Sequence, residues 1–551
     1  MARRLGGGIG GGIAGAAVLI GAITILARVT GFAKQLAFAR AVGTNCLATA
    51  YYTANQVPNL VFEVVVGGAL AGMVVPVLAG AAARSTEEAR AEVGRISSAL
   101  MTWVLVVLVP AGVLVALAAG PVTRLLVRSD VPGCDPAAVT AVATRMLVVF
   151  APQIPLYGMA VVLYGVLQAH RRFSGPAVAP LVSSVVVIVA YLVFAPLSGG
   201  VKDPASVPGP AELALSAGTT LGVLALVVTV LGPGGRLGLR WRPTLRFPGG
   251  VAVQVRRLAL AGLSALVAQQ VATAVVIPLA NGRIGGGALA AYNYAWAIYQ
   301  VPYAVLAVPI ATSAFPALSA RAESGDGEGF AALSARTTRA VLLVSGLAAG
   351  ALAAVAGSMA HVFLAQADTR ISTAVFARAI ALFAPGLVGY GLIAHLSRVL
   401  YAAGRGRAAA WGTVAGWLVA VAAQVTLVFL LPQDWRLGGL ALGQAAGMTL
   451  GGAVLLVSVL AARGAQAVRG VARAALAAVL GGGGGFLAGW GVAALLDGGG
   501  PWGGLATGVP AGVAALTAGV LIAAAVDRRD LAAALSRFRG GRKDREPVDA
   551  A

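Results

Sequence analysis

Three ionisable side chains near the N-terminus lie within long apolar runs, where a charge is costly. Arg28 and Lys34 occupy the first run, and Glu63 lies in the second, five residues after Pro58. An ionisable group in hydrocarbon costs several kcal/mol unless it faces a partner or a wet cavity, so such groups usually mark a substrate or ion path. We therefore expect the functional site at this cluster, with the rest of the chain as its scaffold.

The spacing of these residues limits how they could act together. Arg28 and Lys34 are six residues apart, a rotation of about 240° on an ideal helix, so they face one cavity only if the helix is bent. For Glu63 two interpretations stay open: a counter-ion to Arg28 or Lys34 whose pairing or protonation changes during the functional cycle, or a member of a fixed structural ion pair. Asn55 and Asn59 would suit a cavity that binds hydroxyl or amide groups, and would equally suit hydrogen bonds between helices.

Composition indicates what must position these residues. Hydrophobic residues make up 59% of the 551 positions, charged residues only 11%, and the mean hydropathy is +0.88, a profile typical of a polytopic membrane protein. The apolar runs are continuous rather than alternating, which predicts an all-α protein and excludes an outer-membrane barrel. Fourteen runs are long enough to cross a bilayer, at residues 13–42, 46–80, 96–122, 140–169, 174–197, 211–232, 251–281, 286–318, 338–366, 376–403, 408–431, 437–461, 470–495 and 502–526.

The distribution of basic residues predicts the orientation of these helices, because Lys and Arg concentrate in cytoplasmic loops. With the N-terminus inside, 28 of the 40 Lys and Arg residues fall in cytoplasmic segments or at the cytoplasmic ends of spans, six in outside loops and six deeper within spans. Both termini are therefore expected in the cytoplasm. The net charge of +21 is then explained by orientation and by attraction to anionic inner-leaflet lipids, rather than by nucleic-acid binding.

Internal repetition predicts two related lobes. Residues 145–152 reappear at 378–385, at an offset of 233, and the Gln-Val-Pro sequence at 56–58 reappears at 300–302. Six predicted helices separate the copies. The two halves therefore enter the membrane in the same direction, related by a pseudo-twofold axis along the membrane normal.

The repeats set the predicted domain boundaries. We expect an N-lobe of six helices, a basic cytoplasmic linker, a C-lobe of six helices, a further helix pair and a cytoplasmic tail, at residues 1–232, 233–250, 251–463, 464–526 and 527–551. Proline frees a backbone carbonyl and kinks a membrane helix. Pro58 and Pro302 are therefore candidate hinges at which a lobe could rock or a helix could flex.

Little in the sequence suggests enzymatic or metal chemistry. It contains no H-E-x-x-H, no Walker A motif and no acidic pair for a metal within a span, and its three histidines are scattered. We expect no enzyme, no cofactor and no bound metal. Cys46 and Cys134 both lie near predicted outside loops, so a disulfide is geometrically conceivable, but two cysteines lack the ligand spacing of a zinc or iron site.

The N-terminal motifs resemble those of a known family. The sequence Ala-Arg-Val-Thr-Gly-Phe-Ala-Lys at 27–34, Asn-Gln-Val-Pro-Asn at 55–59, Glu63, Gly-Gly at 67–68 and Val-Pro at 75–76 are similar to the signature of the MurJ/MviN murein-precursor flippases, in the multidrug/oligosaccharidyl-lipid/polysaccharide exporter superfamily. The resemblance extends over essentially the whole chain and implies fourteen helices in two pseudo-symmetric lobes with an extra C-terminal pair. It also implies transport of lipid II, the undecaprenyl-pyrophosphate-linked disaccharide pentapeptide, from the inner to the outer leaflet.

The pyrophosphate of such a substrate fits the two cations. Arg binds phosphate oxygens in a bidentate manner, while Lys provides a point charge, and Arg28 and Lys34 match positions that are basic in the family's cavity. Three further charges that the family leads us to expect are absent: an acid at Thr49, a base at Phe62 and an arginine near Ala297. A cavity with fewer cations would hold a pyrophosphate less firmly.

Two kinds of function follow from these observations. The favoured one is a multi-pass flippase of the bacterial inner membrane that moves lipid II by alternating access, with Arg28 and Lys34 at the pyrophosphate and Glu63 modulating them. The alternative is a non-transporting membrane partner of the cell-envelope synthesis machinery, or an exporter of another polyprenol-linked or amphipathic substrate. The expected partners are lipid II, membrane lipids and cell-wall synthesis proteins, and no nucleic acid.

Overall fold

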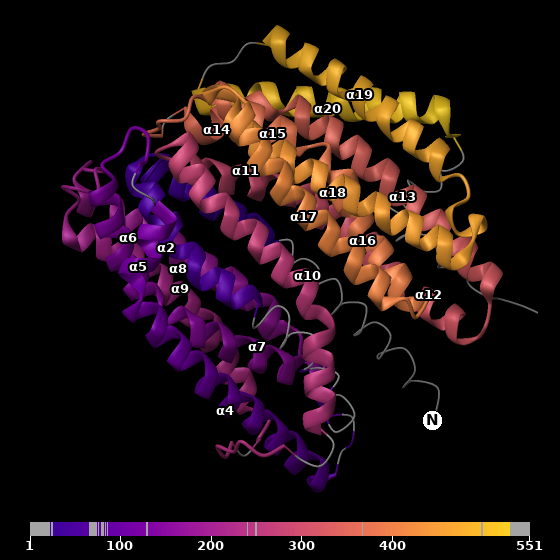
Figure 1. The fold of residues 1–551 in the computed structure, drawn as a ribbon, viewed down its shortest axis with the longest axis horizontal. Coiled ribbons are helices and arrows are strands. Elements are labelled where there is room, and N and C mark those ends of the chain that lie inside the picture. Colours follow the sequence, from indigo (N-terminus) through magenta and orange to yellow (C-terminus); the bar gives the residue numbers. More distant parts are fainter. Residues whose placement is uncertain are drawn as a thin grey trace, which may run out of the picture. The chain divides into compact units, whose positions relative to one another are not determined.

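The computed structural model describes residues 26–64, 86–127, 130–239, 241–247, 251–365, 367–496 and 500–528, with a few isolated positions among the remainder. Within these residues nearly every segment is helical, and the only β-type pairing is an isolated bridge between Thr44 and Thr369 (Figure 1). By packing, the chain divides into two compact units. Unit 1 takes in Met1–Ala290 and Ala367–Arg370, and unit 2 takes in Ala291–Gln366 and Ile371–Ala551.

Unit 1 is a helical bundle. Its described helices are α2 (Cys46–Phe62), α4 (Glu87–Leu117), α5 (Ala119–Val127), α6 (Pro136–Phe150), α7 (Gln153–Ala169), α8 (Ser174–Ser198), α9 (Gly209–Gly235), α10 (Val251–Leu279) and the π-helix η2 (Ala280–Ile284). Residues 26–41 are also helical. In the core, Leu100 and Leu108 of α4 pack with Ile154 and Val166 of α7, and α2 contacts α6 and α7.

Unit 2 combines a second bundle with the C-terminal helix pair. Its elements are α11 (Ala288–Pro302, shared at its start with unit 1), the π-helix η3 (Tyr303–Ala307), α12 (Val308–Glu323), α13 (Gly327–Ala354), α14 (Ala356–Leu364), α15 (Thr373–Phe383), α16 (Gly386–Ala402), α17 (Gly406–Leu430), α18 (Gln433–Arg463), the 3₁₀ helix η4 (Ala465–Val468), α19 (Val471–Leu496) and α20 (Gly500–Val526). Helices α19 and α20 pack on each other and on α13.

A glycine run in α19 permits that packing. A Cβ atom at Gly350 of α13 would overlap with the backbone of Gly482, and one at Gly485 would lie 2.5 Å from the carbonyl oxygen of Ala515 in α20. Only residues without a side chain let three helix backbones approach this closely. The run Gly481 to Gly485 is thus a packing surface.

The predicted spans agree with the helices wherever both are described. Among the described residues, twelve helices are long and apolar enough to cross a membrane, and they correspond in order to the third through fourteenth predicted spans. The first two predicted spans, 13–42 and 46–80, lie partly outside the described residues; their described parts, 26–41 and α2, are helical. The all-α membrane fold is therefore confirmed, whereas the count of fourteen stays a prediction.

The repeated motif occupies equivalent places in the two units. In unit 1, α6 ends at Phe150 and α7 begins at Gln153, on either side of Pro152. In unit 2, α15 ends at Phe383 and α16 begins at Gly386, on either side of Pro385. The sequence repeat is therefore also a structural repeat, in which one span is broken at its proline. By packing, α10 belongs to unit 1; the predicted C-lobe, which begins at residue 251, stays a prediction.

Candidate functional site

The predicted cations lie on the helical segment 26–41 of unit 1. Arg28 is exposed and Lys34 is half-buried. The far end of the segment is anchored, since Phe38 is fully buried and its ring packs against Tyr51 and Tyr52 of α2 at centroid distances of 4.7 and 5.0 Å. The cations therefore occupy the less buried part of a helix whose other end is fixed in the core.

The first half of α2 is buried, and its tyrosine hydroxyl groups are hydrogen-bonded. The Tyr51 hydroxyl hydrogen-bonds with those of Tyr191 and Thr219, each at 2.8 Å, and the Tyr52 hydroxyl donates to Gln35 at 2.8 Å. Residues 46–54 are all buried. Such a fully partnered, dehydrated segment is suited to holding the fold together rather than to binding a polar substrate.

The second half of α2 carries a polar stripe. Asn55, Asn59 and Glu63 are spaced four residues apart, so they share one face of the helix, and all three are half-buried. The Asn59 side-chain oxygen accepts a hydrogen bond from the Tyr157 hydroxyl at 3.2 Å. Pro58 is buried within this half. The structure thus brings three of the predicted site residues together on one surface, which we call the α2 stripe.

Glu63 lies where the α-helix of α2 changes to a π turn. Its backbone N–H donates to the carbonyl oxygens of Asn59 and Leu60, and residues 63–64 have π-helical geometry. None of the ion pairs between described residues joins Glu63 to Arg28 or Lys34. In this conformation the carboxyl group therefore has neither cation as a salt-bridge partner.

A second polar cluster surrounds the start of α2, and sequence analysis identified only part of it. Cys46 and Cys134 form a disulfide, which the sequence left as a geometric option. Four segments of unit 1 meet there: 43–49, 131–134, 285–287 and 367–370. We call this cluster the disulfide clasp.

Hydrogen bonds connect the four segments of the disulfide clasp. The backbone N–H of Thr44 donates to Asp368, and that of Arg370 donates back to Thr44, each at 2.9 Å. The Arg370 guanidinium donates to the carbonyl oxygen of Gly133, and the Asn45 amide donates to the Asp368 carboxylate at 2.9 Å. Chain segments more than 200 residues apart in sequence are thereby held at one place.

The clasp also requires glycine at close approaches. Gly43 and Gly287 have φ of +102° and +82°, in the left-handed region, and a Cβ atom at Gly287 would overlap with the carbonyl group of Thr44. The N–H of Gly287 donates to the Thr49 hydroxyl at 2.8 Å. Thr49 is a position where the family resemblance leads us to expect an acid, so its hydroxyl here belongs to the clasp.

Two arginines at equivalent places of the repeat each fix a following helix. Arg145 of α6 forms a salt bridge of 2.6 Å with Glu212, a buried residue in the first turn of α9. Arg378 of α15 donates to the carbonyl oxygen of Asp434 at 2.5 Å, and its guanidinium lies 4.2 Å from the ring centre of Trp435, both in the first turn of α18. Sequence analysis missed the role of Glu212 because it lies at the very edge of its predicted span.

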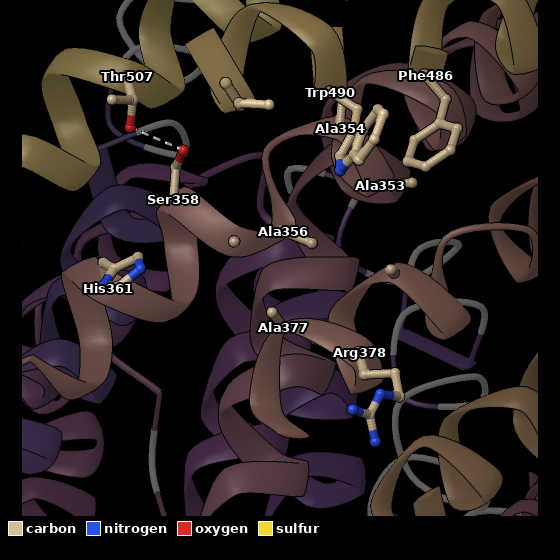
Figure 2. Close-up of a pocket in the computed structure, with 14 residues that line it drawn as sticks. Ala353, Ala354, Ala356, Ser358, His361, Ala377, Arg378, Phe486, Trp490 and Thr507 are labelled. Carbon is tan, nitrogen blue, oxygen red and sulfur yellow. Dashed lines mark hydrogen bonds between the residues drawn. The ribbon is translucent and has the colours of Figure 1, made fainter. Parts of the chain in front are cut away.

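Unit 2 contains a pocket of about 410 Å³ between α13, α14, α15, α19 and α20. Figure 2 shows Ser358 and Thr507 hydrogen-bonded to each other, at 3.1 Å, on one side of it. Most of the other lining is alanine, with Phe486 and Trp490. Arg378 reaches the pocket but is engaged with α18 as described above. This largely apolar pocket contains none of the predicted site residues.

The predicted hinge at Pro302 also coincides with a change of helix type. Pro302 is the last residue of α11, and the π-helix η3 follows it directly. Pro58 and Pro302 thus each precede a π turn within five residues. π turns are rare and weaken the regular ladder of hydrogen bonds, so both prolines lie where a helix can change direction.

Comparison with known proteins relates the chain to one family. The family model described as "Lipid II flippase MurJ" matches residues 38–482. The lipid II flippase MurJ of Burkholderia cenocepacia is 30% identical over 398 residues, covering 70% of this chain and 73% of that protein. The probable lipid II flippase MurJ of Rhizobium tropici is 26% identical over 394 residues, covering 70% of each.

Solved structures agree on the fold. A lipid II flippase MurJ in an inward closed conformation superposes with a TM-score of 0.70 at 16% identity, covering 93% of this chain and 99% of that one. An inward-facing multidrug resistance MATE family transporter of the MOP superfamily gives 0.62 at 14% identity, covering 81% and 97%. Both likenesses concern the helical architecture described above.

Proposed function

Since the chain belongs to the MurJ family of lipid II flippases, we propose that it moves lipid II, the undecaprenyl-pyrophosphate-linked peptidoglycan precursor, from the inner to the outer leaflet by alternating access. The family match over residues 38–482 carries this proposal. It includes the α2 stripe, the disulfide clasp and both copies of the repeat. The protein thus acts in the inner membrane of a bacterial cell, with both termini in the cytoplasm.

The substrate's pyrophosphate binds at Arg28 and Lys34. Exposure of Arg28 and half-burial of Lys34 leave both side chains accessible to an anionic group, and phosphate oxygens are preferred partners of arginine. The α2 stripe lies in the same unit and offers the amides of Asn55 and Asn59. Glu63 has no salt bridge to either cation in this conformation, so it can modulate them by pairing in another one.

Alternating access needs elements that bend. Pro58 and Pro302, each followed by a π turn, supply those bends in the two halves of the chain. The predicted lobes, 1–232 and 251–463, are the bodies that rock. Lipid II and membrane lipids are the partners required by this mechanism, and cell-wall synthesis proteins are the enzymes that would consume its product.

One observation favours a second candidate. Thr49 is hydrogen-bonded into the disulfide clasp, and Phe62 lies against the ring of Tyr157 at 4.3 Å, so two positions expected to carry charges have structural roles instead. A chain that had lost its cavity charges could serve as a non-transporting partner of the envelope-synthesis machinery, or could export another polyprenol-linked or amphipathic substrate.

The accessibility of lipid II in the outer leaflet separates these functions. Cells whose only candidate flippase is this chain are compared with cells that carry an empty vector, and surface lipid II is labelled. A flippase restores both growth and labelling. Growth without labelling would favour the scaffold, and neither growth nor labelling would favour an exporter of another substrate.

A further inference from the structure

Four aromatic rings of unit 2 form a stack that the proposed pyrophosphate site does not use. Trp296 and Tyr299 of α11 lie 5.2 Å apart between ring centroids, Tyr299 and Tyr390 of α16 lie 6.0 Å apart, and Tyr303 of η3 lies 4.0 Å from Tyr390. In each pair the ring planes are within 26° of parallel. We call this set the aromatic ladder.

The ladder packs against a further aromatic ring, and three of its four rings are only half-buried. Phe383 of α15 packs against Trp296 and Tyr299 at 5.9 and 5.4 Å, and Tyr299 is only 1% exposed. Trp296, Tyr303 and Tyr390 are half-buried. Three rings of the ladder are therefore partly accessible on a rigid support.

The helix that carries the ladder has two faces of different chemistry. Asn293, Trp296, Gln300 and Tyr303 follow one another at intervals of three and four residues and are all half-buried. Val301 and Val305 on another side are 43% and 52% exposed. Valine suits contact with lipid chains, whereas amide and phenol groups are costly in hydrocarbon. The first face is therefore suited to a polar ligand.

Two further observations mark the ladder as a binding surface. The Tyr299 hydroxyl is buried and has no hydrogen-bond partner among the described residues, which is unusual for a buried donor. The π-helix η3, which contains Tyr303, begins directly beyond Pro302, and π turns occur frequently at functional sites.

We propose that the aromatic ladder binds the pyranose rings of the lipid-linked disaccharide. The C–H face of a sugar ring packs on a flat aromatic surface, and the amide of Gln300 is placed on the same helical face to hydrogen-bond its hydroxyl groups. The inference rests on the proposed flippase function and names the part of the substrate that unit 2 recognises.

A binding measurement with two lipids tests this assignment. The purified full chain in nanodiscs is titrated with lipid II and with undecaprenyl pyrophosphate, which lacks the sugars and peptide. The intact chain should bind lipid II more tightly. Trp296→Ala should weaken lipid II binding by about tenfold and leave undecaprenyl pyrophosphate binding unchanged, while the control Trp411→Ala, which removes a 70% exposed ring on α17, should change neither.

The outcomes separate the ladder from the flippase proposal. If Trp296→Ala does not fold, Gln300→Ala, which keeps every ring, should give the same selective loss at smaller size. Equal affinity of the intact chain for the two lipids, or an equal loss for both in the variants, overturns the sugar site and leaves the flippase function standing. Binding of neither lipid by the intact chain would overturn both proposals.

Discussion

The two ends of α2 differ in almost every property that matters for function. At the Cys46 end, side chains are buried, hydroxyl groups are paired, and a disulfide and the segment 367–370 hold the helix in place. At the Glu63 end, the side chains of the α2 stripe are half-buried, and the Asn59 side chain accepts a hydrogen bond from Tyr157. One helix thus combines a fixed end with an adaptable one.

The difference in hydrogen bonding between the two ends of α2 indicates which end can change conformation during transport. The Cys46 end is costly to rearrange, because the loss of any one hydrogen bond there leaves a buried polar group unsatisfied. A half-buried polar end, placed beyond a proline and at a π turn, can change partners at low cost. Substitutions at the Cys46 end of α2 should therefore alter stability, and substitutions at the Glu63 end should alter transport.

The largest effect is expected from a single methyl group in the disulfide clasp. Gly287→Ala would place a Cβ atom against the Thr44 carbonyl group and force a left-handed residue, so we expect no folded protein. Gly325 has a similar φ of +74° but open space around it, so Gly325→Ala should cost only about 1 kcal/mol. Size-exclusion chromatography of the two variants checks this, and equal yields would contradict the role of the clasp.

Removal of the disulfide should be the next largest effect. It closes a separation of 88 residues, and loss of such a link typically costs about 2–5 kcal/mol of unfolding free energy. The double variant Cys46→Ser and Cys134→Ser should have a lower thermal midpoint in detergent, matched by the intact chain under reducing conditions. Transport per folded molecule should stay unchanged, and a selective loss of transport would place the clasp in the cycle itself.

Glu63→Gln tests the adaptable end. The amide keeps the shape and removes the negative charge, so we expect transport to fall by about tenfold with no change in thermal midpoint. Glu88→Gln, at an exposed position in the first turn of α4, is the matched control. If Glu63→Gln lowers the midpoint instead, Glu63 is part of a structural ion pair, the other of the two interpretations that the sequence left open.

The smallest effect is expected at the hydrogen bond between Tyr157 and Asn59. Tyr157→Phe removes the hydroxyl that donates to Asn59 and keeps the ring that packs on Phe62. A bond of this kind contributes about 1 kcal/mol, so transport should change by less than tenfold. A complete loss would mean that the Tyr157 hydroxyl contacts the substrate.

Sequence patterns predicted the helices well because membrane helices follow from continuous apolar runs. The break at Pro152 could be expected for the same kind of reason, since its repeat partner Pro385 occurs in an equivalent span and proline lacks an N–H group. These are local properties of the chain. They need no knowledge of which helices meet.

Contacts between distant segments could not be predicted in the same way. The partner of Thr49 is the backbone of Gly287, 238 residues away, and the partner of Arg145 is Glu212 in another helix. The spacing of Trp296, Tyr299 and Tyr303 is visible as a helical stripe, but Tyr390, which completes the aromatic ladder, belongs to α16. Composition predicts that a polar group needs a partner, and only the fold identifies it.

The central claim is that Arg28 and Lys34, on the helical segment that precedes α2, carry the substrate. The most direct test labels surface lipid II in cells that depend on Arg28→Ala, with Arg40→Ala as the control, because Arg40 is an exposed arginine on the same helix. At equal amounts of folded protein, we predict that labelling is lost with Arg28→Ala and retained with Arg40→Ala. Full labelling with Arg28→Ala would contradict the account.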